Sequence, residues 1–139
     1  MEKKKIRFAV IGCGHIGKRH AAMVLNNAGC ELVVLCDNRS PEETGAAQFD
    51  VPYFNEMSLM LREGSDFDVL CIATPNGLHE THAIQALRAG KHVVVEKPMA
   101  LTKAGCEKII YESLHQHRQV FCVMQNRYSP PSVWLKNII

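Results

Sequence analysis

The feature that most constrains the fold is a series of short, continuously apolar runs that recur along the 139-residue chain. Each run is rich in valine and isoleucine, is bounded by turn residues, and lacks the alternation of a half-buried strand. The runs cover residues 6–11, 32–36, 69–73, 92–95 and 120–124. Continuous apolar strands of this kind are typical of a parallel sheet that is covered on both faces.

Helical signals lie between these runs. Ser40-Pro41-Glu42-Glu43 combines an N-cap, a proline at the first helical position and a capping-box glutamate. Other helices are expected over residues 16–27, 55–62, 79–89 and 102–117, and another opens at Ser129. Regular alternation of strand and helix predicts a single α/β domain with a doubly wound, mostly parallel sheet.

A glycine motif connects the first strand to the first helix: Gly12-Cys13-Gly14-His15-Ile16-Gly17. In a dinucleotide site Gly12 allows the tight turn, Gly14 lets the backbone approach a pyrophosphate, and Gly17 allows close helix packing. The amides of His15 and Ile16 then open a helix whose N-terminus attracts an anion. With Asp37 twenty positions after Gly17, the motif predicts a Rossmann dinucleotide-binding fold rather than a ligand-free turn.

The residues that end the second strand indicate which cofactor is bound. Asp37, followed by Asn38, is placed to accept hydrogen bonds from the adenosine ribose hydroxyls. A carboxylate repels a 2′-phosphate, so NAD is favoured over NADP. Arg39 leaves the second cofactor open, because it could swing in to pair with a phosphate.

Two further polar groups follow apolar strands, at the edge where ligands bind in open α/β sheets. Thr74-Pro75-Asn76 with His79 is one group, and an ordinary strand-to-helix turn is the alternative. Glu96-Lys97-Pro98 is the other, where Pro98 biases Lys97 towards an extended conformation. A strand-end salt bridge is its alternative. His79 and His82 have metal-compatible spacing but no carboxylate or cysteine partner, so surface histidines are expected and no metal site.

Together with His20, these motifs resemble the glucose–fructose oxidoreductase / inositol dehydrogenase (Gfo/Idh/MocA) family. The resemblance implies an NAD(P)-dependent oxidoreductase that acts on a sugar, nucleotide sugar or cyclitol. It places Lys97 at the nicotinamide as the catalytic residue, with Glu96 and His79 nearby and Asn76 near the ribose. The ending is similar to members that oxidise UDP-N-acetylglucosaminuronic acid, which places Asn126 with Arg127 at the junction of cofactor and substrate.

The domain expectation also comes from the resemblance. Residues 1–125 form the dinucleotide-binding domain, and residues 126–139 begin the connection to a C-terminal substrate domain that this chain lacks. The chain is therefore expected to be the cofactor half of a dehydrogenase, inactive alone, and homo-oligomeric when full-length. A non-catalytic NAD-binding sensor module and an inactive truncated fragment are the alternatives.

Composition excludes several other classes. A net charge of +2 is too small to indicate nucleic acid as a partner. No apolar stretch approaches the roughly 18 residues of a membrane span, and the N-terminus lacks a signal peptide. The six cysteines form no C-x-x-C pair, which favours reduced core residues and a cytoplasmic location.

Overall fold

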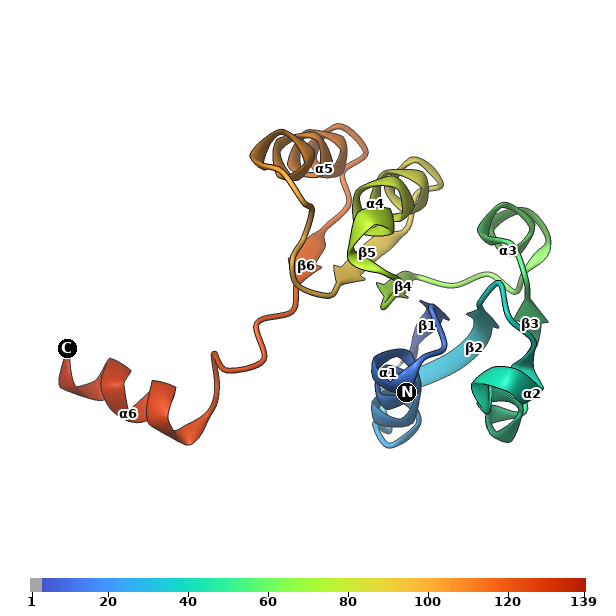
Figure 1. The fold of residues 1–139 in the computed structure, drawn as a ribbon, viewed down its shortest axis with the longest axis horizontal. Coiled ribbons are helices and arrows are strands. Elements are labelled where there is room, and N and C mark those ends of the chain that lie inside the picture. The colour runs from blue at the N-terminus through green and yellow to red at the C-terminus, as the bar shows by residue number, and fades with distance from the viewer. Residues whose placement is uncertain (1–3) are drawn as a thin grey trace.

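A computed structural model describes residues 4–139 and contains one six-stranded sheet in which every pairing is parallel. The strands are β1 (Ile6–Ile11), β2 (Cys30–Cys36), β3 (Tyr53–Phe54), β4 (Val69–Ile72), β5 (His92–Val95) and β6 (Val120–Cys122). Their spatial order is β3-β2-β1-β4-β5-β6 (Figure 1). The order reverses between β1 and β4, which makes that pair the switch point of a doubly wound sheet.

Residues 4–139 contain six α-helices, and all but the last cover the faces of the sheet (Figure 1). They are α1 (His15–Leu25), α2 (Pro41–Thr44), α3 (Met57–Glu63), α4 (His79–Arg88), α5 (Lys103–His115) and α6 (Pro130–Ile138), with short 3₁₀ turns at Ala46–Phe49 and Asn76–Leu78. In Figure 1, α1 and α2 lie on one side of the sheet, and α3, α4 and α5 lie on the other. The doubly wound α/β prediction is therefore confirmed.

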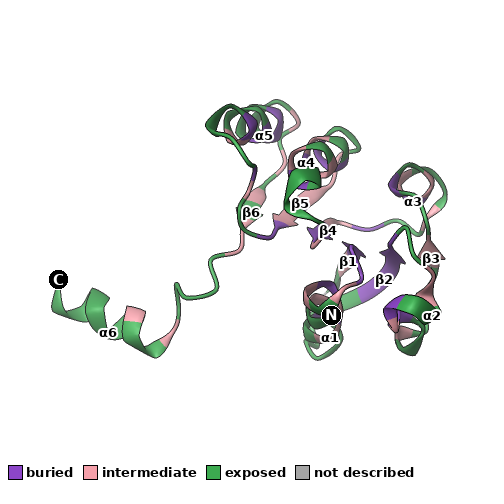
Figure 2. Ribbon diagram, in the orientation of Figure 1, coloured by how far each residue is buried: buried purple, intermediate pink, exposed green. Residues whose placement is uncertain are grey.

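Two apolar layers correspond to these two helical faces. One contains Ala21 and Val24 of α1 against Val10 and Leu35, and the other contains Leu87 and neighbouring apolar residues of α3, α4 and α5. Strands β1, β2 and β4 are the most continuously buried part of the chain (Figure 2). Burial on both faces explains why these strands are continuous apolar runs.

Element boundaries follow the sequence prediction closely, apart from β3. Strands 6–11 and 92–95 have the predicted limits, and Ser40 forms the complete capping box with Glu43. β3 was not predicted because it has only two residues, too few to form a recognisable apolar run. Its pairing with Leu35 and Cys36 of β2 is a tertiary interaction that local pattern does not contain.

The C-terminal part differs in character from the rest. After β6 the chain runs out from the sheet, and α6 stands away from the other helices (Figure 1). No residue of α6 is buried, and Trp134 is 67% exposed. The division into a 1–125 domain and a 126–139 connection stays a prediction, and the first three residues of the predicted domain lie outside the described part. Among residues 4–139, no helix is long and apolar enough to cross a membrane.

Candidate cofactor site

The glycine turn after β1 is built by backbone contacts. Gly12 has a positive φ of 88°, and its N–H donates to the Cys36 carbonyl at 2.8 Å. A Cβ on Gly12 would lie 2.6 Å from the carbonyl carbon of Ala73, so glycine is required by both conformation and space. A Cβ on Gly17 would overlap the Gly12 carbonyl oxygen, because α1 packs directly on the turn.

Gly14 differs from the other two glycines of the motif. A Cβ at Gly14 would meet no atom within 4 Å, so the fold itself does not require glycine here. Gly14 is the N-cap of α1, no side chain caps that helix, and its first turn contains no acidic residue. The N-terminal amides of α1 therefore remain available for an anion beside an open backbone, as a pyrophosphate site requires.

A cleft of about 550 Å³ opens at the carboxyl ends of the central strands. It is lined by Ile11, Gly12, Gly14, Cys36, Asp37, Asn38, Arg39, Asn55, Met57, Ala73, Thr74, Pro75, Leu78 and His82. The lining comes mostly from the segments after β1, β2 and β4, with two residues from the segment after β3. It lies at the switch point where open α/β sheets bind ligands. We call this cavity the cofactor cleft.

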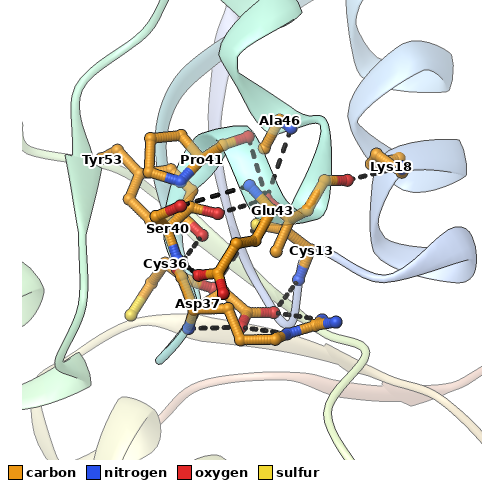
Figure 3. A network of polar contacts seen from close by, with 11 residues as sticks. Cys13, Lys18, Cys36, Asp37, Ser40, Pro41, Glu43, Ala46 and Tyr53 are labelled. Atoms are coloured by element: carbon orange, nitrogen blue, oxygen red, sulfur yellow. Dashed lines mark hydrogen bonds and ion pairs between the residues drawn. The ribbon is translucent and has the colours of Figure 1, made fainter.

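Asp37 lines this cleft and is buried. It lies in a network of polar contacts (Figure 3). Its Oδ2 accepts the Cys13 N–H at 2.7 Å, and its Oδ1 accepts the Arg39 N–H at 3.0 Å. The Arg39 guanidinium also donates to both carboxylate oxygens, each at 3.2 Å. Tyr53 fixes this loop by donating its hydroxyl to the Arg39 carbonyl at 2.8 Å.

These contacts determine the charge of the site. Burial opposes ionisation of Asp37, but hydrogen bonds from Arg39 and from the Cys13 amide outweigh it and hold the Asp37 pKa below its ordinary value. Burial raises the pKa of the Cys13 thiol to about 11 and that of Cys36 to about 12. Both thiols therefore stay protonated at neutral pH. All six cysteines are free, but only Cys13, Cys36 and Cys71 are buried core residues, and the other three are half-buried.

Thr74 connects the turn after β4 to two histidines of α4. Its hydroxyl lies 3.0 Å from His82 Nδ1, and its carbonyl oxygen lies 2.7 Å from His79 Nε2. The other ring nitrogen of His79 lies 2.7 Å from the Pro98 carbonyl oxygen. His79 is only 1% exposed, so the expectation of a surface histidine is wrong at that position. Its buried ring is in contact with two backbone carbonyl oxygens.

The two charged residues that follow β5, Glu96 and Lys97, lie in different environments. Glu96 is buried and its Oε1 lies 2.8 Å from His20 Nε2 of α1, whereas Lys97 is exposed. Among residues 4–139, no ion pair includes Lys97. The side-chain contact at the strand end thus belongs to Glu96, and Lys97 remains at the rim with its ammonium group uncommitted.

Two further clefts flank this rim and share Gln125 and Asn126. One, of about 490 Å³, is lined by Lys97, Met124, Gln125, Asn126, Arg127 and Ser132. The other, of about 440 Å³, is lined by Ile16, Arg19, His20, Met23, Glu96, Val123, Gln125 and Asn126. Asn126 therefore lies between the Glu96 side and the Lys97 side of the same sheet edge.

The residues predicted for the site accordingly fall into three places. Gly12, Gly14, Asp37, Asn38 and Thr74 line the cofactor cleft, and Ile16, Glu96, Lys97 and Asn126 line the two flanking clefts. His15 and Asn76 are exposed, whereas Gly17 and His79 are buried. Within residues 4–139 no cluster of histidine, cysteine and acidic residues suits a metal.

Sequence reasoning left some cleft residues out of the site. Arg39 was considered only as a partner for a phosphate, and His82 only as a surface residue. Asn55 and Met57 enter the cleft through the β3–α3 segment, whose strand was not predicted. The only local signal was the position of Arg39, two residues after the acidic end of β2.

An anion-accepting helix start, an acidic residue after β2 and a cleft at the switch point define a dinucleotide-binding Rossmann domain. Residues 6–124 match the model of the oxidoreductase family with an NAD-binding Rossmann fold. The chain belongs to that Gfo/Idh/MocA family, and it is the family's NAD-binding domain.

Similar proteins agree with this assignment. The chain is 31% identical to inositol 2-dehydrogenase of Salmonella paratyphi B, over 96% of this chain and 41% of the relative. It is 33% identical to the inositol 2-dehydrogenase/D-chiro-inositol 3-dehydrogenase of Halalkalibacterium halodurans, over 96% and 40%. The WlbA dehydrogenase from Bordetella pertussis, in complex with NADH and UDP-GlcNAcA, superposes with a TM-score of 0.90 and 36% identity, over 96% and 41%. The chain thus spans about 40% of the length of these relatives.

Proposed function

We propose that this chain is the cofactor-binding part of an NAD-dependent dehydrogenase that oxidises a hydroxyl group of a sugar, nucleotide sugar or cyclitol. The proposal assigns the pyrophosphate to Gly12, Gly14 and the α1 amides of His15, Ile16 and Gly17. It assigns the adenosine ribose to Asp37 and Asn38. The nicotinamide half is assigned to Thr74, Asn76, Glu96, Lys97 and Asn126, with the buried His79 behind them in contact with the Thr74 carbonyl. Bound NAD supplies the hydride acceptor.

The observation that carries the proposal is the state of Lys97. Glu96 is turned inward and paired with His20, so its charge is not used on the neighbouring lysine. Lys97 is exposed and lines a cleft with Asn126 at the carboxyl edge of the sheet. An uncommitted ammonium group at this edge is suited to orient a substrate hydroxyl. It would also take part in removing the hydroxyl proton, directly or through a histidine from another part of the protein. A sensor module has no need of such a group.

The cleft beside Lys97 also supports a substrate class. Arg127 lines it with Lys97, so two cations face one cavity together with the amides of Gln125 and Asn126. Two cations beside hydrogen-bonding amides favour an acidic sugar, and the similar WlbA dehydrogenase was crystallised with such a ligand, UDP-GlcNAcA. We therefore rank a nucleotide-linked sugar acid ahead of a neutral cyclitol.

Steady-state assays of the complete enzyme test this function. NAD reduction is measured with UDP-GlcNAcA, myo-inositol and a simple glucoside, first for the wild type. Lys97→Ala is expected to lower turnover by about 100-fold or more while NAD affinity changes little. Lys103→Ala removes an exposed lysine of α5 paired with Glu107 and serves as the matched control. Normal turnover of the Lys97 variant would reject the catalytic role, and no NAD reduction with any sugar would reject the substrate class.

Two wider properties complete the proposal. Six free thiols, three of them buried, suit a reducing compartment, and we place the protein in the cytoplasm. Exposed apolar side chains on β6 and α6, including Phe121 and Trp134, support homo-oligomerisation of the complete protein. Light scattering of the complete protein tests the second property, which a monomer would overturn.

A further inference from the structure

His79 makes two contacts that a neutral imidazole cannot satisfy together. Its Nδ1 lies 2.7 Å from the Pro98 carbonyl oxygen and its Nε2 lies 2.7 Å from the Thr74 carbonyl oxygen. Carbonyl oxygens only accept hydrogen bonds, so each contact needs an N–H from the ring. A neutral ring has one N–H, and its other nitrogen would oppose a carbonyl lone pair. Only the imidazolium, which has two N–H groups, donates to both carbonyls.

The neighbouring histidine provides a contrast. His82 Nδ1 lies 3.0 Å from the Thr74 hydroxyl, a group that can either donate or accept, so a neutral ring is satisfied there. Burial, and then the charge of His79, lower the His82 pKa from its ordinary value. Of the two histidines that contact Thr74, only His79 has a carbonyl oxygen opposite each of its ring nitrogens.

The charged groups on the surrounding elements are engaged elsewhere. Glu80 of α4 pairs with Lys108 of α5, Arg88 with Glu112, and Glu96 with His20. Lys97, which precedes Pro98, is exposed. Within residues 4–139, no carboxylate forms an ion pair with His79. The two backbone carbonyls are thus the polar groups that lie against the nitrogens of this buried ring.

The two carbonyls belong to different loops of the cofactor edge. Thr74 follows β4 and lines the cofactor cleft, whereas Pro98 follows Lys97 after β5. We propose that His79 is a positioning residue, an imidazolium that clamps the turn after β4 to the Lys97-Pro98 segment. The effect of this clamp on the catalytic role of Lys97 rests on the proposed function above. The clamp between the two loops does not depend on that function. Loss of one ring proton releases one of the two loops.

Nitrogen NMR of the ¹⁵N-histidine-labelled 139-residue chain tests the clamp directly. At pH 7, both ring nitrogens of His79 are expected to be protonated and slow to exchange, whereas His82 has one protonated nitrogen. A bare ring nitrogen in His79 would overturn the proposal. This measurement uses the wild type and needs no cofactor. Its result therefore remains valid even if the chain binds no NAD. Absence of NAD binding would reject the proposed function but not the clamp.

The consequence for the site is tested by calorimetric titration with NAD across a pH series. Wild-type affinity is expected to fall by about tenfold over the pH interval in which NMR records loss of the second His79 proton, as one charged hydrogen bond is lost. His79→Gln should bind weakly and lack this step, while His115→Gln on the exposed side of α5 should keep it. The same step in His79→Gln would contradict the positioning role. If that variant does not fold, the NMR result decides.

Discussion

Arg39 covers the carboxylate of Asp37 by donating from its guanidinium to both oxygens at 3.2 Å. The carboxylate that is expected to bind the adenosine ribose is therefore already occupied by a cation whose side chain is 53% exposed. Such an arrangement has two consequences. In the proposed ribose site the hydroxyls reach Asp37 once Arg39 shifts partly aside, and the displaced guanidinium is then expected beside the 2′ position.

Removing Arg39 should sharpen the preference for NAD. In Arg39→Ala the Asp37 carboxylate loses its neutralising partner, so it repels a 2′-phosphate more strongly and is freer to accept ribose hydroxyls. We expect NADP affinity to fall by about tenfold or more, while NAD affinity is unchanged or improved. Titration calorimetry with both cofactors measures the ratio. A parallel loss for the two cofactors would mean that Arg39 does not read the 2′ position.

Arg39 also illustrates the limits of the sequence as a predictor. Strands 6–11 and 92–95 were predicted to the residue, because a run buried on both faces is continuously apolar and ends where burial ends. The site residues next to those ends followed from the same logic. The pairing of Arg39 with Asp37 depends on a loop held by Tyr53, and the burial of His79 depends on a carbonyl 19 residues away. Neither relationship is present in a local pattern.

Alanine substitutions at Gly14 and Gly17 should distinguish an effect on ligand binding from an effect on folding. Gly14→Ala adds a methyl group to open space, so the chain should fold normally, yet NAD affinity should fall by about tenfold or more because the methyl lies where the pyrophosphate approaches. Gly17→Ala drives a methyl group into the Gly12 carbonyl and should destabilise the fold by about 3 kcal/mol. Urea unfolding and NAD titration of both variants measure this contrast. Full NAD affinity in Gly14→Ala would remove the pyrophosphate from this turn.

Acid should weaken the contribution of Asp37 to stability. Its pKa in the folded protein lies below the ordinary aspartate value of about 3.9. A depressed carboxyl pKa gives stability that is fully present above that value and is lost as the pH falls through the folded pKa. Asp37→Asn keeps the Cys13 contact but has no titrating charge. The free energy of unfolding of the wild type, relative to this variant, should therefore be constant from pH 7 to 5 and fall below about pH 4. Urea unfolding at these pH values tests this, and a constant difference down to pH 2 would contradict it.

The pair of His20 with Glu96 should be worth more than an exposed ion pair, because both side chains are largely buried. In His20→Ala the Glu96 carboxylate is left without its partner inside the fold, and the free energy of unfolding should fall by about 2 kcal/mol. Glu96→Gln keeps the shape and a hydrogen bond to His20, so its loss should be smaller, about 1 kcal/mol. Arg62→Ala breaks an exposed pair with Glu63 and is the control, with an expected loss within about 0.5 kcal/mol. Equal losses in His20→Ala and Arg62→Ala would mean that the buried pair does not anchor α1 to the end of β5. In that case the backbone after β5, and not the contact of Glu96 with His20, would determine the exposed position of Lys97.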